Sequence, residues 1–367
     1  MKNNHVTVLE IDLNAVKFNL NYFKSKLQEN TQILVVVKAF GYGSDAVAIA
    51  KSIQNDVSYF AVAYTDEGIA LRESGINTPI LVLHPHIANL ELDIQYCLEP
   101  NLYNEKILKS FLLLAKGKNL SQYPVHLKFN TGLNRLGFSE NEIELISSTL
   151  KNQNYIKVKS IFSHMVASED SNEREFTLKQ IQSFERIIST FKNQLGYKPL
   201  IHMANTSGII NYQNAHFDMV RLGIGLYGFG NDPEETSKLR NVISLKSVIS
   251  QIHTIEKGES VGYNRAYIAD KITKTATIPI GHADGINRRL GQKVGYLQVN
   301  NQKAPIIGNV CMDMIMIDIT NINCNEGDEV IIFDTQQNVE DLAQKADTIS
   351  YELLTAVSQR VKRQILC

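Results

Sequence analysis

Short apolar segments alternate with amphipathic ones along the first two thirds of the chain. The apolar segments are rich in β-branched residues and are bounded by turn residues, a pattern typical of buried strands. They are ILVVV (33–37), YFAVA (59–63), ILVL (80–83), CLEPNLY (97–103), VHLKF (125–129), KSIF (159–162), LIHM (200–203) and MVRLGIGLYG (219–228). The segments between them have helical spacing. Eight strands alternating with helices predict an α/β fold, a (β/α)8 barrel.

An open, doubly wound sheet is the alternative to the barrel, but no G-x-G-x-x-G sequence follows the first predicted strand. After residue 238 the pattern changes to β-rich segments separated by Gly, Asn and Asp turns. We therefore predict a barrel over 10–238 and a mostly antiparallel β-domain over 239–367. The opening segment VTVLEID is expected to add a strand to this β-domain, which would then include residues 1–9. One helix is predicted over 339–358.

Polar residues close six of the predicted barrel strands. They are Lys38, His84, Lys128, His164, Asn205 and Arg221. Because the parallel strands of a barrel end on one face, where barrel active sites lie, we expect these side chains to share a site. Most of them are cationic or can become so, which predicts an anionic ligand.

The loops after the last two barrel strands carry groups that fit a phosphate. Asn205 and Thr206 can donate hydrogen bonds and begin a helix, and Gly223 lets the backbone approach a phosphoryl group closely. A lysine beside a bound phosphate fits two chemistries. It can act as a point charge for a phosphosugar, or it can bind pyridoxal phosphate covalently.

Composition and charge exclude several other classes. The 367 residues are 44% hydrophobic and 20% charged, as in a globular protein with a large core. A net charge of −1 gives no reason to expect a nucleic-acid or anionic-membrane partner. We expect neither a signal peptide nor a membrane span. The four cysteines are scattered without a C-x-x-C pair, so we expect no metal site, reduced thiols and a cytoplasmic location.

The segment VVVKAFGYG (35–43) resembles the cofactor-lysine segment of the alanine racemases, which are pyridoxal-phosphate enzymes with a barrel and a β-domain. Other segments resemble the family in order and spacing. They are KFNTGLNRLGF (128–138), SHMVASED (163–170), HMANTSG (202–208), RLGIGLYG (221–228), VGYNRAY (261–267), IPIGHADGINRRLG (278–291), GNVCMDMIMID (308–318) and ISYELLTAVSQRV (349–361). The resemblance implies a homodimer that binds pyridoxal 5'-phosphate and an amino acid, converting L-alanine to D-alanine for peptidoglycan.

The resemblance also assigns roles to residues. Lys38 matches the lysine that binds the cofactor, and Tyr263 matches the opposite base, supplied by the partner subunit. The other residues that match cofactor contacts are Tyr42, His164, Asn205, Thr206, Arg221, Gly223, Ile224 and Tyr351. Arg135, Met312 and Asp313 match substrate contacts. Lys128 matches a lysine that is carbamylated in many members, His202 supports Arg221, and His282 replaces an entryway tyrosine.

These residue types suit racemisation, which needs a base on each face of the substrate. A tyrosine with an ordinary pKa of about 10 is a poor base at neutral pH, and we expect the charge of Arg221 and its two histidines to lower that pKa. In the resemblance, Arg221 matches the arginine on the pyridine nitrogen of the cofactor. Arg221 should not give up its proton to that nitrogen, because guanidinium has a pKa above about 12. We therefore expect the pyridine nitrogen to stay unprotonated, which disfavours transamination.

Several alternatives stay open. Phe40 and His282 depart from the usual family residues, which leaves room for a serine or broad-specificity racemase. An amino-acid decarboxylase of the same fold is disfavoured because Arg221 stands where such enzymes have an acidic residue. A non-catalytic pyridoxal-phosphate carrier has the barrel without the β-domain. A phosphosugar-binding barrel enzyme is the remaining alternative.

Overall fold

The computed structural model describes residues 5–151, 153–230 and 232–367, which divide into two compact units. The first unit contains Lys17–Ala39 and Ala46–Leu239. The second contains Arg240–Cys367, the segment Phe40–Asp45 and the N-terminal residues up to Val16. The chain therefore passes from one unit to the other within helix α1 (Leu13–Lys24) and again on both sides of Phe40–Asp45.

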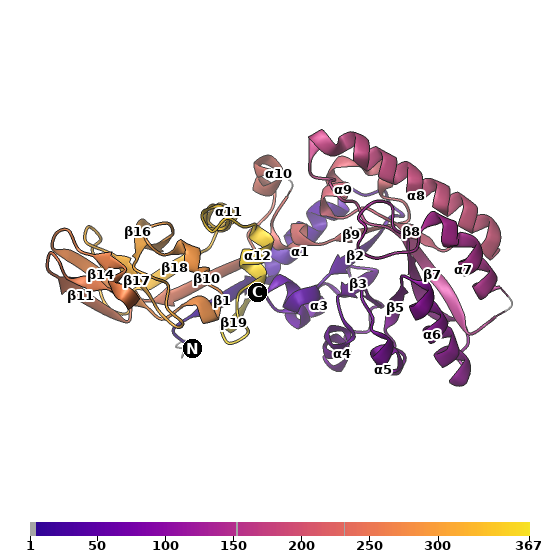
Figure 1. The fold of residues 1–367 in the computed structure, drawn as a ribbon, viewed down its shortest axis with the longest axis horizontal. Coiled ribbons are helices and arrows are strands. Elements are labelled where there is room, and N and C mark those ends of the chain that lie inside the picture. Colours follow the sequence, from indigo (N-terminus) through magenta and orange to yellow (C-terminus); the bar gives the residue numbers. More distant parts are fainter. Residues whose placement is uncertain (1–4, 152, 231) are drawn as a thin grey trace. The chain divides into compact units, whose positions relative to one another are not determined.

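Within the described residues, eight parallel strands close the first unit into a barrel (Figure 1). They are β2 (Gln32–Val36), β3 (Tyr59–Val62), β4 (Ile80–Val82), β5 (Glu99–Leu102), β6 (Tyr123–Lys128), β7 (Ile156–Phe162), β8 (Leu200–His202) and β9 (Met219–Leu222). The barrel closes where β9 pairs with β2, with Arg221 in register with Leu34. The predicted fold class is confirmed. The last strand is shorter than predicted, because η5 (Ile224–Tyr227) follows it as a 3-10 helix.

Helices connect the barrel strands and surround them (Figure 1). They are α3 (Ala46–Ile53), α4 (Thr65–Glu73), α5 (Leu90–Gln95), α6 (Glu105–Gly117), α7 (Ile143–Leu150), α8 (Arg174–Leu195) and α9 (Thr206–Asn211), and the short helix α10 (Pro233–Ser237) follows the last barrel strand. One of them, α5, has six residues and escapes prediction, because so short a helix shows little of the helical period.

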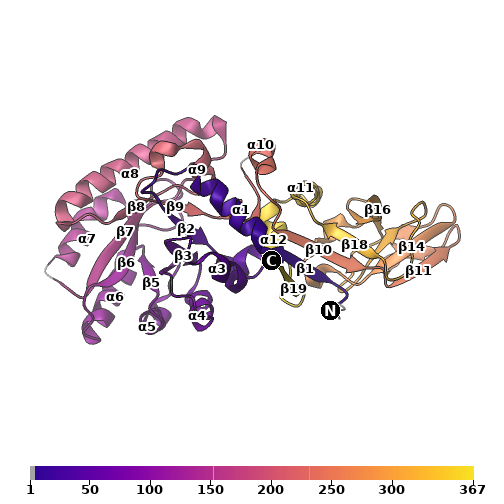
Figure 2. The ribbon, with the colours of Figure 1, turned by 180° about the vertical axis from the view of Figure 1, so that it is seen from behind.

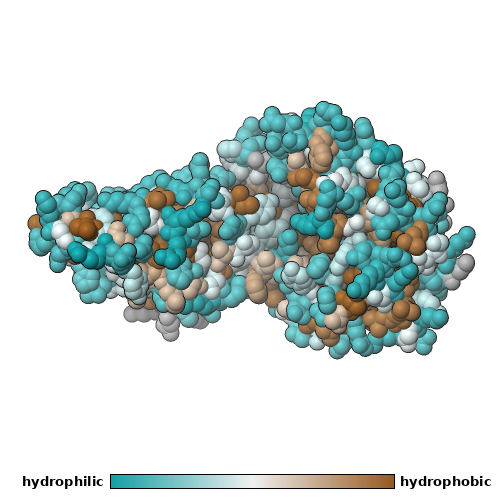
Figure 3. All heavy atoms as spheres, viewed as in Figure 1, coloured by the Kyte–Doolittle hydropathy of each residue, from teal (hydrophilic) through white to brown (hydrophobic). Residues whose placement is uncertain are grey.

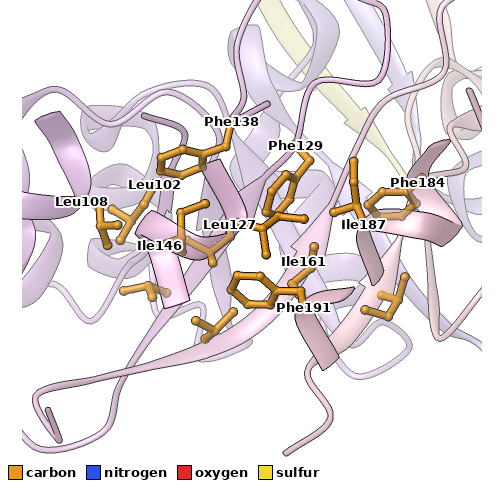
Figure 4. Close-up of a cluster of buried hydrophobic side chains, with 14 of the residues drawn as sticks. Leu102, Leu108, Leu127, Phe129, Phe138, Ile146, Ile161, Phe184, Ile187 and Phe191 are labelled. Atoms are coloured by element: carbon orange, nitrogen blue, oxygen red, sulfur yellow. The ribbon is translucent and has the colours of Figure 1, made fainter. Parts of the chain in front are cut away.

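A large apolar cluster packs between the barrel and its helices (Figure 4). The ring of Phe129 lies 5.9 Å from that of Phe191 on α8 and 6.1 Å from that of Phe138. Leu127 on β6 also belongs to this cluster. Because side chains alternate along a strand, His126 and Lys128 on β6 point to the opposite side, into the barrel. The outer face is therefore apolar, whereas the inner face carries polar side chains.

The second unit is built on a large sheet. Across its described residues nine strands pair in the order β11-β14-β17-β16-β15-β18-β10-β1-β19. They are β1 (Val8–Asp12), β10 (Ile243–Val248), β11 (Gln251–Ile255), β14 (Thr273–Ile278), β15 (Tyr296–Val299), β16 (Gln302–Ile307), β17 (Ile315–Asp318), β18 (Glu329–Phe333) and β19 (Lys362–Leu366). A separate ribbon joins β12 (Ser260–Val261) and β13 (Tyr267–Ile268).

The N-terminal strand belongs to this sheet, as the sequence predicts. Strand β1 pairs antiparallel with β10, where Leu9 is in register with Leu245. On its other side β1 pairs parallel with the C-terminal strand β19, and Figure 2 shows β1 between these two strands. The first and last strands of the described chain therefore lie side by side in one sheet.

The helix predicted over 339–358 is wrong in one respect. The structure has two helices there, α11 (Gln336–Lys345) and α12 (Ser350–Thr355). Between them Asp347 adopts a left-handed conformation with φ of 57°. The apolar spacing continues across this turn, and for that reason the sequence pattern does not reveal the break.

The face of the molecule in Figure 3 is mostly hydrophilic, with separate hydrophobic patches rather than a continuous band. Among the helices described by the structure, none has both the length and the apolar character needed to cross a bilayer.

Candidate active site

Lys38 follows the buried strand β2 and begins a short left-handed turn, α2 (Lys38–Tyr42). Ala39, Phe40 and Tyr42 have φ values of 52°, 56° and 54°. The left-handed conformation costs about 1–2 kcal/mol for each residue with a side chain, so backbone strain is concentrated beside Lys38. Such strain is typical of functional sites, where the surrounding structure holds it.

Glu67 on α4 holds this turn and is a site residue that the sequence analysis missed. One carboxylate oxygen, Oε1, accepts the N–H of Ala39 at 2.7 Å. The other, Oε2, accepts the N–H of Ala63 at 2.6 Å, just after β3. Glu67 therefore joins the ends of two neighbouring strands. The only signal in the sequence is an acidic residue in the first turn of a predicted helix, which indicates a cap and not this role.

The Lys38 amine is partly buried in a cationic environment. Burial lowers its pKa below the ordinary lysine value, the charge of Arg135 lowers it further, and Glu67 opposes them. A lysine with a lowered pKa is more often in the neutral, nucleophilic form. The geometry therefore supports a reactive amine at the end of β2.

Lys128, the last residue of β6, belongs to the same group of cations. Burial lowers its pKa to about 8, and the charges of Arg135, Arg221 and Lys38 act in the same direction. Four of the cations predicted from the sequence therefore influence one another at the C-terminal end of the barrel. Such a group repels further cations and attracts an anionic ligand.

Arg221 on β9 is almost completely buried and held by four acceptors. Its Nη2 donates to the carbonyl oxygens of Ser163 at 2.7 Å and Met203 at 2.9 Å, and lies 3.0 Å from Nδ1 of His164. Its Nη1 donates to Nδ1 of His202 at 2.8 Å. Burial lowers the pKa of Arg221 to about 9, so the group is still a cation at neutral pH.

The two histidines are neutral, which corrects one expectation. Burial and the charge of Arg221 hold the pKa of both His164 and His202 well below the ordinary histidine value. They cannot add positive charge around a catalytic tyrosine, so the expected field comes from Arg221 and the neighbouring cations alone. Both imidazoles instead accept hydrogen bonds from the guanidinium.

The predicted phosphate-binding loops meet at Thr206. Its Oγ1 accepts the N–H groups of Gly223 at 3.1 Å and Gly225 at 3.3 Å, which leaves the hydroxyl hydrogen to donate. A Cβ on Gly225 would lie 2.5 Å from the ring of Phe23, so only glycine fits there. Asn205 caps α9, because its Oδ1 accepts the N–H of Gly208 at 2.8 Å.

The segment after Lys38 and helix α12 bring two predicted tyrosines together in the second unit. The rings of Tyr42 and Tyr351 lie 6.0 Å apart, with 50° between their planes. Gly43 packs directly on the backbone of Leu354, and Arg363 donates to the Gly43 carbonyl at 2.8 Å. Burial raises the pKa of Tyr42, and Tyr351 adds to the effect, so its phenol keeps its proton.

Three other predicted residues form one block in the second unit. The N–H of His282 donates to the carbonyl of Cys311 at 2.9 Å, and the next N–H donates to that of Met312 at 3.0 Å. Arg360 donates to Asp313 at 2.6 Å. The same guanidinium makes two further bonds, at 2.6 and 3.1 Å, to the carboxylate of Asp284 in the 3-10 helix η7 (His282–Asp284).

Arg360 lies inside a segment that resembles the family, but its role in this block was not predicted. The sequence shows only an arginine shortly before the C-terminal strand. Its two acidic partners, Asp313 and Asp284, lie 47 and 76 positions away in the sequence. Sequence spacing alone does not reveal such a pairing.

Tyr263 lies on the surface of the second unit, in the 3-10 helix η6 (Tyr263–Arg265), with 74% of it exposed. The following Asn264 is left-handed, with φ of 58°. The carbonyl of Tyr263 accepts a hydrogen bond from Asn309 at 3.2 Å, which fixes the backbone and leaves the phenol exposed. Met312 is also largely exposed.

Comparisons with known proteins match both parts of the chain to one family. The alanine racemase N-terminal domain matches residues 11–231, and the alanine racemase C-terminal domain matches residues 242–365. The alanine racemase of Treponema denticola is 37% identical, over 96% of this chain and 96% of its own.

Solved structures match over the whole chain as well. The alanine racemase of Clostridium difficile 630 is 31% identical and superposes with a TM-score of 0.93, covering 100% of this chain and 97% of its own. The alanine racemase of Bartonella henselae, solved with covalently bound pyridoxal phosphate, is 28% identical with a TM-score of 0.89, over 99% of this chain and 100% of its own. The chain belongs to the alanine racemase family.

Proposed function

We propose that this protein interconverts L-alanine and D-alanine with pyridoxal 5'-phosphate bound covalently to Lys38. The observation that carries the proposal is the group of cations around Lys38 at the end of the barrel, in a chain that matches alanine racemases over both domains. The Bartonella henselae relative holds the same cofactor covalently. The product would serve peptidoglycan synthesis, and the four free cysteines support a cytoplasmic location.

The residues at this end of the barrel fit a phosphorylated pyridine. Lys38 supplies an amine with a lowered pKa. Thr206 can donate a hydrogen bond to a phosphate, with Gly223 and Ile224 beside it. After its bonds to protein acceptors, Arg221 keeps its Nε–H and one Nη1–H among the described residues for a ring nitrogen. When bound, pyridoxal phosphate stabilises the carbanion left after the α-proton of an amino acid is removed.

Asn205, Tyr42 and Tyr351 complete the cofactor contacts in this proposal. Asn205 caps the helix that begins at Thr206, which supports a role in holding this end of the helix at the phosphate. The two phenols are expected to donate to the phosphate, and the raised pKa of Tyr42 supports a protonated donor there.

Lys38 is the proposed base on one face of the substrate. Its lowered pKa brings the neutral amine closer to neutral pH, where proton transfer is most effective. Arg135 is expected to bind the substrate carboxylate, since it acts electrostatically on both Lys38 and Lys128. Arg221 would donate a hydrogen bond to the ring nitrogen of the cofactor and keep its own proton. The ring would then withdraw electrons less strongly, which favours racemisation over transamination.

Tyr263 is the proposed base on the other face, and we propose that it acts in the active site of a second copy of the chain. Its exposed phenol and the exposed side chain of Met312 support a surface that is covered in a homodimer. Asp313 and His282 belong to the same block and are expected to line the substrate entrance. In this proposal the β-domain completes the partner's site.

The visible spectrum and optical rotation test the proposed activity. The purified protein should absorb in the visible range through its bound cofactor, and L-alanine should lose its optical rotation. A colourless protein that leaves L-alanine unchanged would refute the proposal. Serine and lysine should be compared with alanine, because His282 and Phe40 are exposed and support a broader racemase as the alternative.

A mixture of two inactive variants tests the shared site. A dimer of one Lys38→Ala chain and one Tyr263→Phe chain contains one site with both native residues. Random pairing should therefore restore about a quarter of the wild-type sites. No recovery on mixing and refolding would show that Tyr263 acts within its own chain or not at all.

A further inference from the structure

A line of buried polar side chains crosses the interior of the barrel. Its members are Glu99, His126, Ser160, His202 and Arg221, one from each of the consecutive strands β5 to β9. Each is at most 8% exposed. Barrel interiors are usually filled by branched apolar side chains, and buried polar groups cost free energy unless they are hydrogen-bonded. Packing alone therefore does not explain this line.

Four hydrogen bonds connect the line without a gap. Arg221 Nη1 lies 2.8 Å from His202 Nδ1, and His202 Nε2 lies 2.8 Å from Ser160 Oγ. Ser160 Oγ lies 2.6 Å from His126 Nδ1, and His126 Nε2 lies 2.8 Å from Glu99 Oε2. The guanidinium of Arg221 thus lies at one end of this hydrogen-bond chain, and the carboxylate of Glu99 lies at the other.

The two ends determine the direction of every bond. Arginine can only donate, so Nδ1 of His202 accepts and its Nε2 carries the hydrogen that is donated to Ser160. An ionised carboxylate can only accept, so Nε2 of His126 carries a hydrogen as well. Nδ1 of His126 is then free to accept the hydroxyl hydrogen of Ser160. Every donor along the chain points towards Glu99.

Other protonation states leave a buried group unsatisfied. If Glu99 carried a proton and donated it to His126, the imidazole would donate its Nδ1–H to Ser160. A doubly protonated His126 would do the same. Ser160 would then accept from both neighbours, and its own hydrogen would have no acceptor in the chain. An unmade buried hydrogen bond costs about 1–3 kcal/mol, so the one-way arrangement is favoured.

Among the described residues, the charge of Arg221 has no carboxylate in direct contact. Its hydrogen-bond partners are two carbonyl oxygens and two neutral imidazoles, and its guanidinium lies 5.4 Å from the centre of the Phe162 ring. No carboxylate forms an ion pair with it in the part of the chain that the structure describes. We propose that Glu99 is the counter-ion of Arg221, and that the one-way chain of three neutral side chains transmits its influence across the barrel.

This inference rests on the proposed function, because it gives Arg221 its part in cofactor binding. The hydrogen-bond chain fixes the plane of the Arg221 guanidinium and keeps Nδ1 of His202 an acceptor. The remaining N–H donors of Arg221 therefore face a constant direction. Glu99 is thus a positioning residue that touches neither cofactor nor substrate. Tyr59 also donates to Glu99 Oε2 at 3.2 Å, and burial raises the pKa of Tyr59, which keeps this donor protonated.

Nitrogen-15 NMR of the wild-type holoenzyme tests the direction of the chain without any substitution. His126 and His202 should both be neutral with hydrogen on Nε2, assigned by the signals lost in His126→Gln and His202→Gln. Hydrogen on Nδ1 of either ring would overturn the proposal. This test stands even if the cofactor proves to be a different anion.

Titration of the apoenzyme with pyridoxal phosphate tests the role of the charge. Glu99→Gln keeps the shape and an acceptor for His126 but removes the charge, and should raise the dissociation constant about tenfold. Tyr59→Phe is the matched control, since it removes the other bond to Glu99 and leaves the charge, and should change the constant less than about twofold.

A constant for Glu99→Gln within twofold of the wild-type value would overturn the proposal. If Glu99→Gln does not fold, Ser160→Ala replaces it, because it interrupts the chain at its centre and should raise the constant similarly. An unchanged constant in folded Ser160→Ala would overturn the proposal equally. Failure of the wild type to bind pyridoxal phosphate would instead refute the proposed function.

Discussion

The site residues of the barrel and those of the β-domain differ in how they are held. In the barrel, Arg221 and Lys128 are buried, and Arg221 is hydrogen-bonded to His202 on the neighbouring strand β8. In the second unit, Tyr263 and Met312 are mostly exposed, although their backbones are tied by hydrogen bonds. The barrel therefore holds its charged side chains inside the fold, while the β-domain presents the side chains of Tyr263 and Met312 on its surface.

This difference follows from how each part positions a side chain. Barrel strands bring residues that are far apart in the sequence to one face, and burial then shifts the pKa of each. The β-domain segments lie in turns, where the backbone is fixed and the side chain projects outward. Substitutions in the barrel should therefore change chemistry and cofactor binding, and those in the β-domain should change proton transfer and substrate binding across an interface.

The largest effect is expected from Lys38→Ala. Loss of the amine removes both the covalent attachment of the cofactor and one base, so racemisation should fall by about 10³-fold or more. The visible absorbance of the covalently bound cofactor should disappear. Lys51→Ala, an exposed lysine on α3, is the control and should leave both unchanged. A normal spectrum in Lys38→Ala would contradict the assignment of the barrel half.

Tyr263→Phe should lower kcat/KM by about 10²- to 10⁴-fold, since it removes one acid–base group. The two enantiomers have equal energy, so kcat/KM must fall equally in both directions. The asymmetry should appear in α-hydrogen exchange in D2O. One enantiomer should exchange through Lys38 faster than it inverts, as followed by NMR. Equal ratios of exchange to inversion for both enantiomers would argue against bases on two faces.

Lys128 should make stability depend on pH in bicarbonate-free buffer. Its pKa is about 8 in the fold and 10.5 in the unfolded chain, so between these values the unfolded state binds more protons. The free energy of unfolding should rise with pH across this window, by up to about 3 kcal/mol. Urea unfolding of wild type and Lys128→Met measures the difference. If the free energies of unfolding of the two proteins changed with pH in parallel, the lowered pKa of Lys128 would be contradicted.

The neutral form of Lys128 also makes a carbamate accessible. With ¹³C-bicarbonate, a carbamate signal is expected in the wild type and not in Lys128→Met. A carbamate would place a negative charge among the cations and remove the pH dependence of stability. A missing signal at a pH above the folded pKa would contradict the carbamate and leave Lys128 as an unmodified amine.

The smallest effect is expected from Arg360→Ala. This substitution releases Asp313 from Asp284, and should raise KM about fivefold while kcat changes less, because the chemistry resides elsewhere. Arg289→Ala is the control, since Arg289 forms an exposed ion pair with Asp347 in the same unit. A KM for Arg360→Ala equal to that of the control would show that the block does not position substrate contacts.

Local patterns were sufficient to predict the strands of the barrel, because most of them lie in short segments rich in apolar and β-branched residues and bounded by turn residues. They failed where a turn interrupts a continuing apolar period, as at Asp347 between α11 and α12. They failed also for Glu67, because a helix cap and a link between two strands look the same in the sequence. The roles of Lys38 and Tyr263 came from the resemblance to a family, and each stays a prediction.

By itself the sequence determined the barrel, the β-domain and the polar residues that end the barrel strands. Only the tertiary structure decided the charge and direction of those groups. It made His164 and His202 neutral, because each is desolvated beside Arg221. It also placed Glu99 at the far end of a hydrogen-bond chain from Arg221. Protonation depends on neighbours in space, and these neighbours come from strands that are far apart in the sequence.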